Sequence, residues 1–343
     1  GMSKLDVAPR GEIAVKIAIH PEFLAKSYFP TSLLKASGLR LIGSRAEDIT
    51  PREMVYGKPS KRLPSAVLIV AGTEANINKA ASLLNSNKTS NAIKEDFCRI
   101  ESIAPFLPKD RKLGLDMVHF NGWLEVVLHA TLGDDDIKQA FFETVHGKGG
   151  EVNLERARSI GGLTFMPAYA PTESSFEFIR GIENFTHLRM LRNMPTLSED
   201  PIQFDEPITR NENFAPTLPN SAALDQEISA VIFDGGFTKD LLPWVNSTDA
   251  AGVPSKATDF PHGHSVTSAF LFGAIGENQS KVSAPYCNVD HVRILPSTAN
   301  DIRVADVIDR IIDTLQAARD AGKPYTLANL SLGPRMPIID DDP

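Results

Sequence analysis

The chain has 343 residues, 42% of them hydrophobic, and carries a formal net charge of −8 at pH 7. This length predicts about two domains, and the apolar content excludes general disorder. No apolar run reaches the ~18–20 residues that span a bilayer, and two cysteines cannot form a disulfide framework, so we expect a cytoplasmic protein with no membrane partner.

The first 193 residues alternate between strand-like and helix-like segments. Runs rich in β-branched and apolar residues predict strands at 12–19, 65–71, 98–103, 123–130, 162–168 and 185–191. Helices are predicted by amphipathic segments at 74–85, 134–146 and 174–180. The acidic run Asp134–Asp136 is expected to cap the second helix. This order predicts an α/β fold for residues 1–193, a sandwich-like region of one or two ferredoxin-like modules without an internal sequence repeat.

A proline-rich stretch separates this region from the rest of the chain. Residues 194–224 contain five prolines in a polar sequence, and proline removes backbone donors, so we expect an extended linker there. The charge changes near the same point: residues 1–190 hold 24 Lys and Arg against 22 Asp and Glu, whereas residues 191–343 hold 11 against 21. The acidic C-terminal part lacks the clustered basic residues that bind a phosphate backbone, so no nucleic-acid partner is expected.

Residues 225–343 have the pattern of a parallel sheet. A helix is predicted over 304–321, because apolar residues recur there at spacings of three and four, and Gly322 ends it. Strand, helix and strand in this order predict parallel strands joined by a right-handed crossover. The strands are predicted at 228–233, 291–295 and 325–330.

Three short segments in this region carry polar groups suited to catalysis. Asp234 ends a predicted strand in Asp-Gly-Gly, and His262 begins a small-residue helix in His-Gly-His-Ser-Val. Residues 329–333 (Asn-Leu-Ser-Leu-Gly) lie at the end of a third predicted strand. Because functional groups gather at the carboxyl ends of parallel strands, we expect the three segments to lie together. A carboxylate beside a histidine can orient the ring as a general base.

These motifs resemble those of the subtilisin-like serine proteases. The strand ending in Asp234 resembles that family's Asp motif, the His262 segment resembles its His-Gly-Thr-His-Val motif, and residues 329–333 resemble its Ser-Leu-Gly strand. The order of Asp before His is also that of subtilisin. The resemblance covers about residues 225–343 and implies the first part of a parallel-sheet subtilisin-like domain. It implies a serine endopeptidase that cleaves peptide or protein substrates, with catalytic roles for Asp234 and His262. Substrate binding is implied for Ser331, Leu332 and Gly333.

The sequence departs from the family pattern in two ways. His264 and Ser265 stand where the family has Thr and His. No Gly-Thr-Ser segment, which carries the family's nucleophile, occurs in the chain. We therefore expect the catalytic serine to lie outside this chain and the chain alone to be inactive, with no cofactor and no metal. Gly1 before Met2 reads as the remnant of a cleaved tag, so the natural length is expected to differ from 343.

A parallel sheet that lacks its later strands keeps an open edge. We expect the N-terminal region or a second copy of the chain, in a homodimer, to cover that edge. Residues 24–30 (Leu-Ala-Lys-Ser-Tyr-Phe-Pro) and 42–45 (Ile-Gly-Ser-Arg) are similar to segments of bacterial intracellular subtilases that are often encoded beside an AAA-type ATPase. This similarity implies such an ATPase as a partner. For residues 1–193 we expect an inhibitory, chaperoning or partner-docking role.

Other interpretations of the same residues stay open. His262 and His264, with Asp290 and His291, offer nitrogen and oxygen donors for a metal-dependent hydrolase. Ser331 can be interpreted as a nucleophile, or more simply as a strand-end residue that acts through its backbone. A non-catalytic regulatory or binding protein is the remaining alternative. The histidines without partner spacing are expected to be structural: His119, His129, His146 and His187.

Overall fold

A computed structural model describes residues 7–54, 59–111, 115–197, 216–253, 261–275, 279–295 and 302–332. The chain divides into two compact units, with the boundary between Met194 and Pro195. Both units combine helices with sheets, so the predicted α/β class is confirmed. Residues 198–215, the middle of the expected linker, lie outside the described residues. None of the helices in the described ranges has the length and apolar character needed to cross a bilayer.

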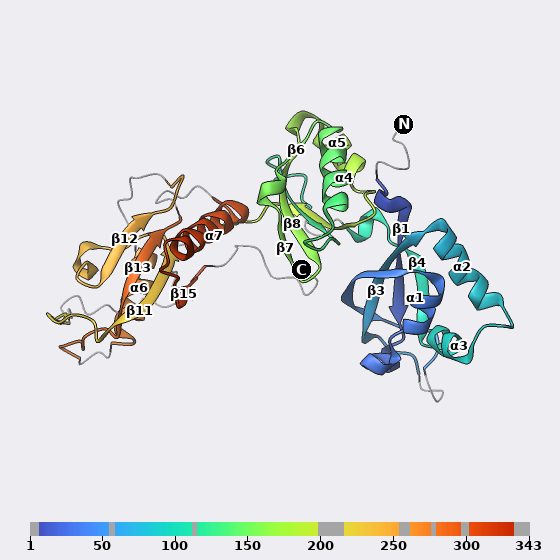
Figure 1. The fold of residues 1–343 in the computed structure, drawn as a ribbon, viewed down its shortest axis with the longest axis horizontal. Coiled ribbons are helices and arrows are strands. Elements are labelled where there is room, and N and C mark those ends of the chain that lie inside the picture. The colour runs from blue at the N-terminus through green and yellow to red at the C-terminus, as the bar shows by residue number, and fades with distance from the viewer. Residues whose placement is uncertain are drawn as a thin grey trace. The chain divides into compact units, whose positions relative to one another are not determined.

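The first module of the N-terminal unit is a four-stranded antiparallel sheet in the order β2-β3-β1-β4, blue to teal in Figure 1. Its elements are β1 (Glu12–Ile19), α1 (Thr31–Ser37), β2 (Arg40–Ile49), β3 (Leu63–Thr73), α2 (Glu74–Asn85), α3 (Asn91–Cys98) and β4 (Ile100–Pro105). If α2 and α3 are counted as one helical segment, the elements follow the βαββαβ order of a ferredoxin-like fold. The helices pack on the face of the sheet that carries Ile17 and Leu68.

The second module repeats this topology. Its elements are β5 (Trp123–Leu128), α4 (Asp135–His146), β6 (Glu151–Val152), β7 (Arg158–Ile160), β8 (Leu163–Tyr169), α5 (Ser175–Ile182) and β9 (Leu188–Asn193). The strands lie in the order β6-β8-β5-β9, with β7 also paired to β8. The first, second, third and fourth main strands of each module therefore occupy matching places, although the sequence contains no recognisable repeat. Apolar residues of β5, α4 and α5, such as Val126, Phe141 and Ile179, fill the core.

Helix boundaries in this unit follow local hydrogen bonds. The predicted helix 74–85 is confirmed, and it begins where the Thr73 hydroxyl accepts a hydrogen bond from the Asn76 amide while the Asn76 side chain accepts one from the Thr73 amide. The predicted strand 98–103 begins too early. Cys98 ends α3, because Asp96 in that helix is buried and accepts a hydrogen bond from the amide of Leu33, which fixes the helix against α1.

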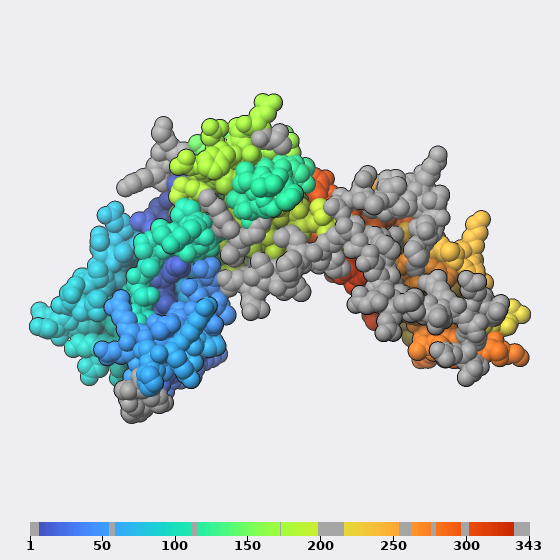
Figure 2. Space-filling model, turned by 180° about the vertical axis from the view of Figure 1, so that it is seen from behind, coloured from blue at the N-terminus to red at the C-terminus, as the bar shows by residue number. Residues whose placement is uncertain are grey.

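A buried arginine joins the two modules, whose surfaces meet in Figure 2. Arg111 follows β4 and is 4% exposed. Its guanidinium donates hydrogen bonds to the backbone oxygens of Phe106, Glu183 and Phe185, the last two in the turn before β9. It also lies 4.7 Å from the centre of the Phe106 ring. Burial lowers the pKa of Arg111 to about 10, and the three carbonyl partners stabilise the charged form.

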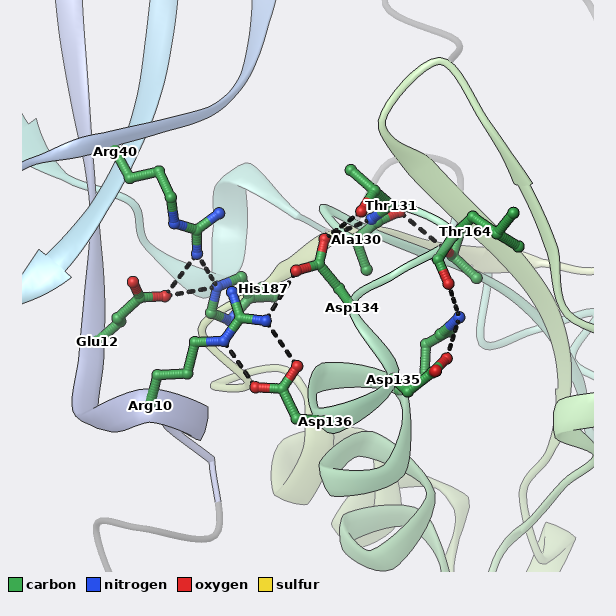
Figure 3. A network of polar contacts seen from close by, with 12 residues as sticks. Arg10, Glu12, Arg40, Ala130, Thr131, Asp134, Asp135, Asp136, Thr164 and His187 are labelled. Carbon is green, nitrogen blue, oxygen red and sulfur yellow. Dashed lines mark hydrogen bonds and ion pairs between the residues drawn. The ribbon is translucent and has the colours of Figure 1, made fainter.

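A polar network joins the start of β1 to the second module (Figure 3). Arg10, which has a left-handed φ of 63°, donates to the carboxylates of Asp134 and Asp136. Asp134 is the N-cap residue of α4, as predicted, but its side chain accepts bonds from Thr131 and Arg10 instead of capping the helix. Glu12 accepts from the buried ring of His187 at 3.0 Å. Both ends of the network thus tie the first module to the second.

Two histidines at the module interface are buried and neutral. Burial lowers the pKa of His187 to about 4 and that of His129 to about 3. His129 lies against β2 so closely that a Cβ on Gly43 would come within 2.4 Å of its ring. Their expected structural role is consistent with this burial.

The C-terminal unit is built on a parallel sheet in the order β12-β13-β11-β15. Its elements are β11 (Asp225–Asp234), β12 (Val245–Asp249), α6 (Pro261–Phe272), β13 (Cys287–Arg293), α7 (Val304–Asp320) and β15 (Leu327–Asn329). A short antiparallel pair, β10 (Thr196–Leu197) and β14 (Ile302–Arg303), lies beside it. The predicted parallel sheet and the predicted helix 304–321 are confirmed, and Gly322 follows α7 with a φ of 73°.

Alternate residues of this sheet face different helices. Ile232 packs in one core with Leu271 of α6, whereas its neighbour Val231 packs in another with Val307 of α7. The two helices therefore cover opposite faces. The connections β12–α6–β13 and β13–α7–β15 run in the same direction across the sheet, so they have opposite hands. Only one of them is the right-handed crossover that parallel sheets favour, and the other is the rare left-handed form.

Short 3₁₀ turns occur at Pro9–Gly11, Pro21–Phe23, Lys26–Tyr28, Pro108–Asp110, Leu154–Arg156, Thr172–Ser174 and Lys239–Leu241.

Candidate active site

Asp234 is the last residue of β11, at the carboxyl end of the parallel sheet. Its side chain is fully buried on the face that α6 covers. One carboxylate oxygen accepts a hydrogen bond from the amide of Gly235 at 2.7 Å. A buried carboxylate needs such donors, because it has lost its hydration.

The glycines of both motifs allow a close approach between the loop after Asp234 and the first turn of α6. Gly236 has a φ of 129°, a backbone conformation that residues other than glycine rarely adopt. A Cβ added to Gly263 would lie 2.1 Å from the carbonyl oxygen of Gly236 and 3.0 Å from a carboxylate oxygen of Asp234. The helix therefore lies against the loop at a distance that only glycine permits.

This approach brings His262 onto Asp234. The Nδ1 atom of His262 lies 3.0 and 3.1 Å from the two carboxylate oxygens. A carboxylate only accepts hydrogen bonds, so Nδ1 carries the proton, and in the neutral ring Nε2 carries the lone pair. Within the described ranges Nε2 makes no hydrogen bond, and the side chain is 26% exposed. A histidine oriented by a carboxylate in this way can act as a general base.

The second histidine of the motif, His264, points to a different partner. Its Nδ1 atom lies 2.8 Å from the hydroxyl of Thr238, and its Nε2 atom lies 4.0 Å from Asp240. Both partners follow the Asp-Gly-Gly segment. His264 therefore holds the loop after Asp234 against α6 and does not face the same point as His262.

A buried pair of polar side chains lies behind the site, and the sequence did not predict it. His291 of β13 is fully buried, and its Nδ1 atom lies 2.8 Å from the hydroxyl of Thr267 in α6. Burial lowers the pKa of His291 to about 4. Thr267 also donates to the carbonyl oxygen of Gly263 at 2.7 Å. No sequence signal links these residues, because the contact depends on how α6 lies on the sheet.

The metal interpretation is not favoured by this geometry. His262, His264 and His291 have separate partners, and Asp290 lies on the other face of the sheet, where it accepts a hydrogen bond from the hydroxyl of Tyr325 at 2.8 Å. Across the residues with described placement, no group of three or more metal-binding side chains converges.

The predicted substrate segment lies beside β11. Asn329 pairs with Ile232, two residues before Asp234, so the segment that follows it leaves the sheet near the same edge as the carboxylate. Ser331 is exposed and its hydroxyl donates to the Asn329 side chain at 2.8 Å, and these two described residues make no hydrogen bond to His262. Leu332 packs with the core under α7, and Gly333 lies outside the described residues. The structure thus brings Asp234 and His262 together, and places Ser331 and Leu332 on the neighbouring strand's extension.

No family model matches the chain, and no curated protein matches it. Among solved structures, a microcompartments protein from Desulfitobacterium hafniense DCB matches with a TM-score of 0.21 and 9% identity, over 52% of this chain and 92% of that chain. The regulatory subunit of aspartate kinase from Thermus thermophilus matches with a TM-score of 0.20 and 10% identity, over 51% of this chain and 92% of that chain. Likenesses of this size carry no argument about family or activity.

Proposed function

We propose that this chain carries the acid and the base of a subtilisin-like serine endopeptidase. The observation that carries the proposal is the buried Asp234 carboxylate, which lies 3.0 Å from Nδ1 of His262 and leaves Nε2 without a partner in the described residues. In this reaction His262 takes the proton of a serine hydroxyl at Nε2. Asp234 holds the required tautomer and stabilises the imidazolium that forms.

The proposal assigns the nucleophile to a serine beyond this chain. The described serines offer no hydroxyl to Nε2 of His262, and Ser331 is bonded to Asn329. The chain alone is then expected to be inactive towards peptides.

The proposal assigns peptide binding to the extension of β15. Within the described part of the sheet β15 pairs with β11 alone, and Leu327 and Leu330 are 49% and 50% exposed. An extended peptide can add to such an open strand through main-chain hydrogen bonds. Coverage of the same edge by a second copy of the chain, as a homodimer, or by the N-terminal region stays a prediction.

Hydrolysis of a chromogenic peptide tests the function. The 343-residue chain is assayed beside a longer protein from the same gene, which continues past residue 343. We expect turnover only from the longer protein. There, Asp234→Asn should lower kcat by about 10⁴, because the amide favours the wrong histidine tautomer. Full activity of the Asp234→Asn protein would rule out the assignment.

For the N-terminal unit we propose a regulatory role towards the protease region, either inhibitory, chaperoning or in docking an AAA-type ATPase. The supporting observation is that its two modules have cores of their own and are joined by Arg111 and the Arg10 network. Adding residues 1–194 as a separate protein to the longer enzyme tests this. A change in kcat, in refolding yield or in ATPase binding supports the role, and no change in any of the three refutes it.

A further inference from the structure

A second polar pair lies directly behind the Asp234–His262 pair. His291 and Thr267 are both fully buried, and they connect the sheet to α6 across the interface that the candidate site occupies. Neither residue can act on a substrate from this position. Burying two polar side chains among apolar neighbours is unfavourable unless their hydrogen bonds are made, so the pair calls for a structural reason.

The protons of this pair can be assigned. The Thr267 hydroxyl has one proton and donates it to the carbonyl oxygen of Gly263 at 2.7 Å. It must therefore accept its second bond, at 2.8 Å, from Nδ1–H of His291. The ring of His291 is neutral, since burial lowers its pKa to about 4. The result is a directed chain of hydrogen bonds from β13, through Thr267, to the first turn of α6.

The same ring also contacts the loop that carries the acid. His291 pairs in register with Ile232, two residues before Asp234, and its ring centre lies 5.0 Å from that of Phe237, three residues after Asp234. One side chain thus touches the loop after the carboxylate and, through Thr267, the turn that follows His262.

We propose that Thr267 and His291 are positioning residues, which hold the first turn of α6 against the Asp234 loop and so keep Nδ1 of His262 within hydrogen-bond distance of the carboxylate. The proposal rests on the proposed function for the meaning of that distance, since a base must be oriented before it can accept a proton. Gly263 permits the approach, and Thr267 with His291 fixes it.

The test measures one proton in the 343-residue chain. With ¹⁵N-labelled histidine, NMR follows the exchange of the Nδ1–H proton of His262 with water, and His262→Gln identifies the signal. Thr267→Val replaces the hydroxyl with a methyl group of similar size, and His291→Phe keeps a ring of similar size without the nitrogens. We expect both variants to exchange this proton at least about tenfold faster, the change that follows from losing a hydrogen bond that favours the closed state.

A matched control and a rescue separate positioning from packing. Thr314 of α7 makes the same hydroxyl-to-carbonyl bond within its helix, to Arg310 at 2.8 Å, on the opposite face of the sheet. Thr314→Val should leave the His262 signal unchanged, and Thr267→Ser, which keeps the hydroxyl, should restore the wild-type exchange rate. If His291→Phe does not fold, the comparison of Thr267→Val with Thr267→Ser decides alone.

Two results would overturn different parts of the account. Wild-type exchange in folded Thr267→Val and His291→Phe would refute the positioning role while leaving the Asp234–His262 pair intact. If the wild-type chain shows no His262 Nδ1–H signal that depends on Asp234, the proposed function itself fails, whatever Thr267 does.

Discussion

Replacing Gly263 by alanine sets two physical effects against each other. In an ordinary helix this change stabilises by up to about 1 kcal/mol, because alanine has the better helix propensity. Here the new Cβ would lie 2.1 Å from the carbonyl oxygen of Gly236 and 2.9 Å from its nitrogen, whereas ordinary contacts begin near 3.4 Å. Both neighbours are backbone atoms, so relief requires the first turn of α6 to move by about 1 Å, and overpacking of this kind costs about 1–3 kcal/mol.

We therefore expect Gly263→Ala to destabilise the C-terminal unit by about 2 kcal/mol and to lengthen the 3.0 Å contact between His262 and Asp234 beyond hydrogen-bond distance. Trp244 lies in the core under α6, so its fluorescence in a Trp123→Phe background reports urea unfolding of this unit. NMR of the His262 Nδ1–H proton reports the contact.

Gly181→Ala in α5 is the matched control. Its Cβ would meet only the flexible side chain of Lys148, at 3.0–3.2 Å, so this variant should be neutral or slightly more stable when Trp123 reports on the N-terminal unit. If Gly263→Ala is as stable as the wild type and keeps the Nδ1–H signal, the close approach inferred from the two glycine motifs is wrong.

Three further outcomes are expected. Arg111→Met should lower the unfolding free energy of the N-terminal unit by about 3 kcal/mol, measured by urea denaturation, because three carbonyls lose their donor, two of them in buried hydrogen bonds; an unchanged midpoint would contradict this. Because His129 and His187 have pKa values of about 3 and about 4 when folded, the unfolded state binds more protons below its ordinary pKa of about 6.5. The urea midpoint of this unit should thus be constant above pH 7 and fall as the pH drops from about 6.5 towards 4, and His129→Leu should flatten that slope; a midpoint independent of pH would argue against buried neutral rings. Asp234→Asn should abolish the protected Nδ1–H signal of His262 with little change in secondary structure by circular dichroism, and persistence of the signal would show that another group holds the ring.

The sequence predicted many of the elements whose side chains face a core, although it missed the short helices α1 and α3, which bury Leu33, Leu34 and Ile93. The buried run at 65–71 and the apolar spacing of 304–321 each gave the right element, because burial imposes a period on the residues. The strands β2 and β12 were not predicted. Both lie at sheet edges and are largely exposed along their length, so no alternation of apolar and polar residues marks them.

The candidate site divides in the same way. The Asp-Gly-Gly and His-Gly motifs could be found in the sequence because the close approach of Gly236 and Gly263 requires glycine at both positions. Thr267 and His291 carry no such signal, since either residue is common on a helix or a strand and their contact is set by packing between two positions 24 residues apart in the chain. For the N-terminal unit the sequence left one or two ferredoxin-like modules open and could not decide between them, because the same order of strands can be built from unrelated apolar residues.

The central claim is that Asp234 and His262 serve a serine that this chain does not contain. The most direct measurement is to treat the longer protein with a serine-directed fluorophosphonate and locate the adduct by mass spectrometry. We expect one modified serine, beyond residue 343, with labelling strongly reduced in His262→Ala. An adduct on a serine within the 343-residue chain, or undiminished labelling in His262→Ala, would contradict it.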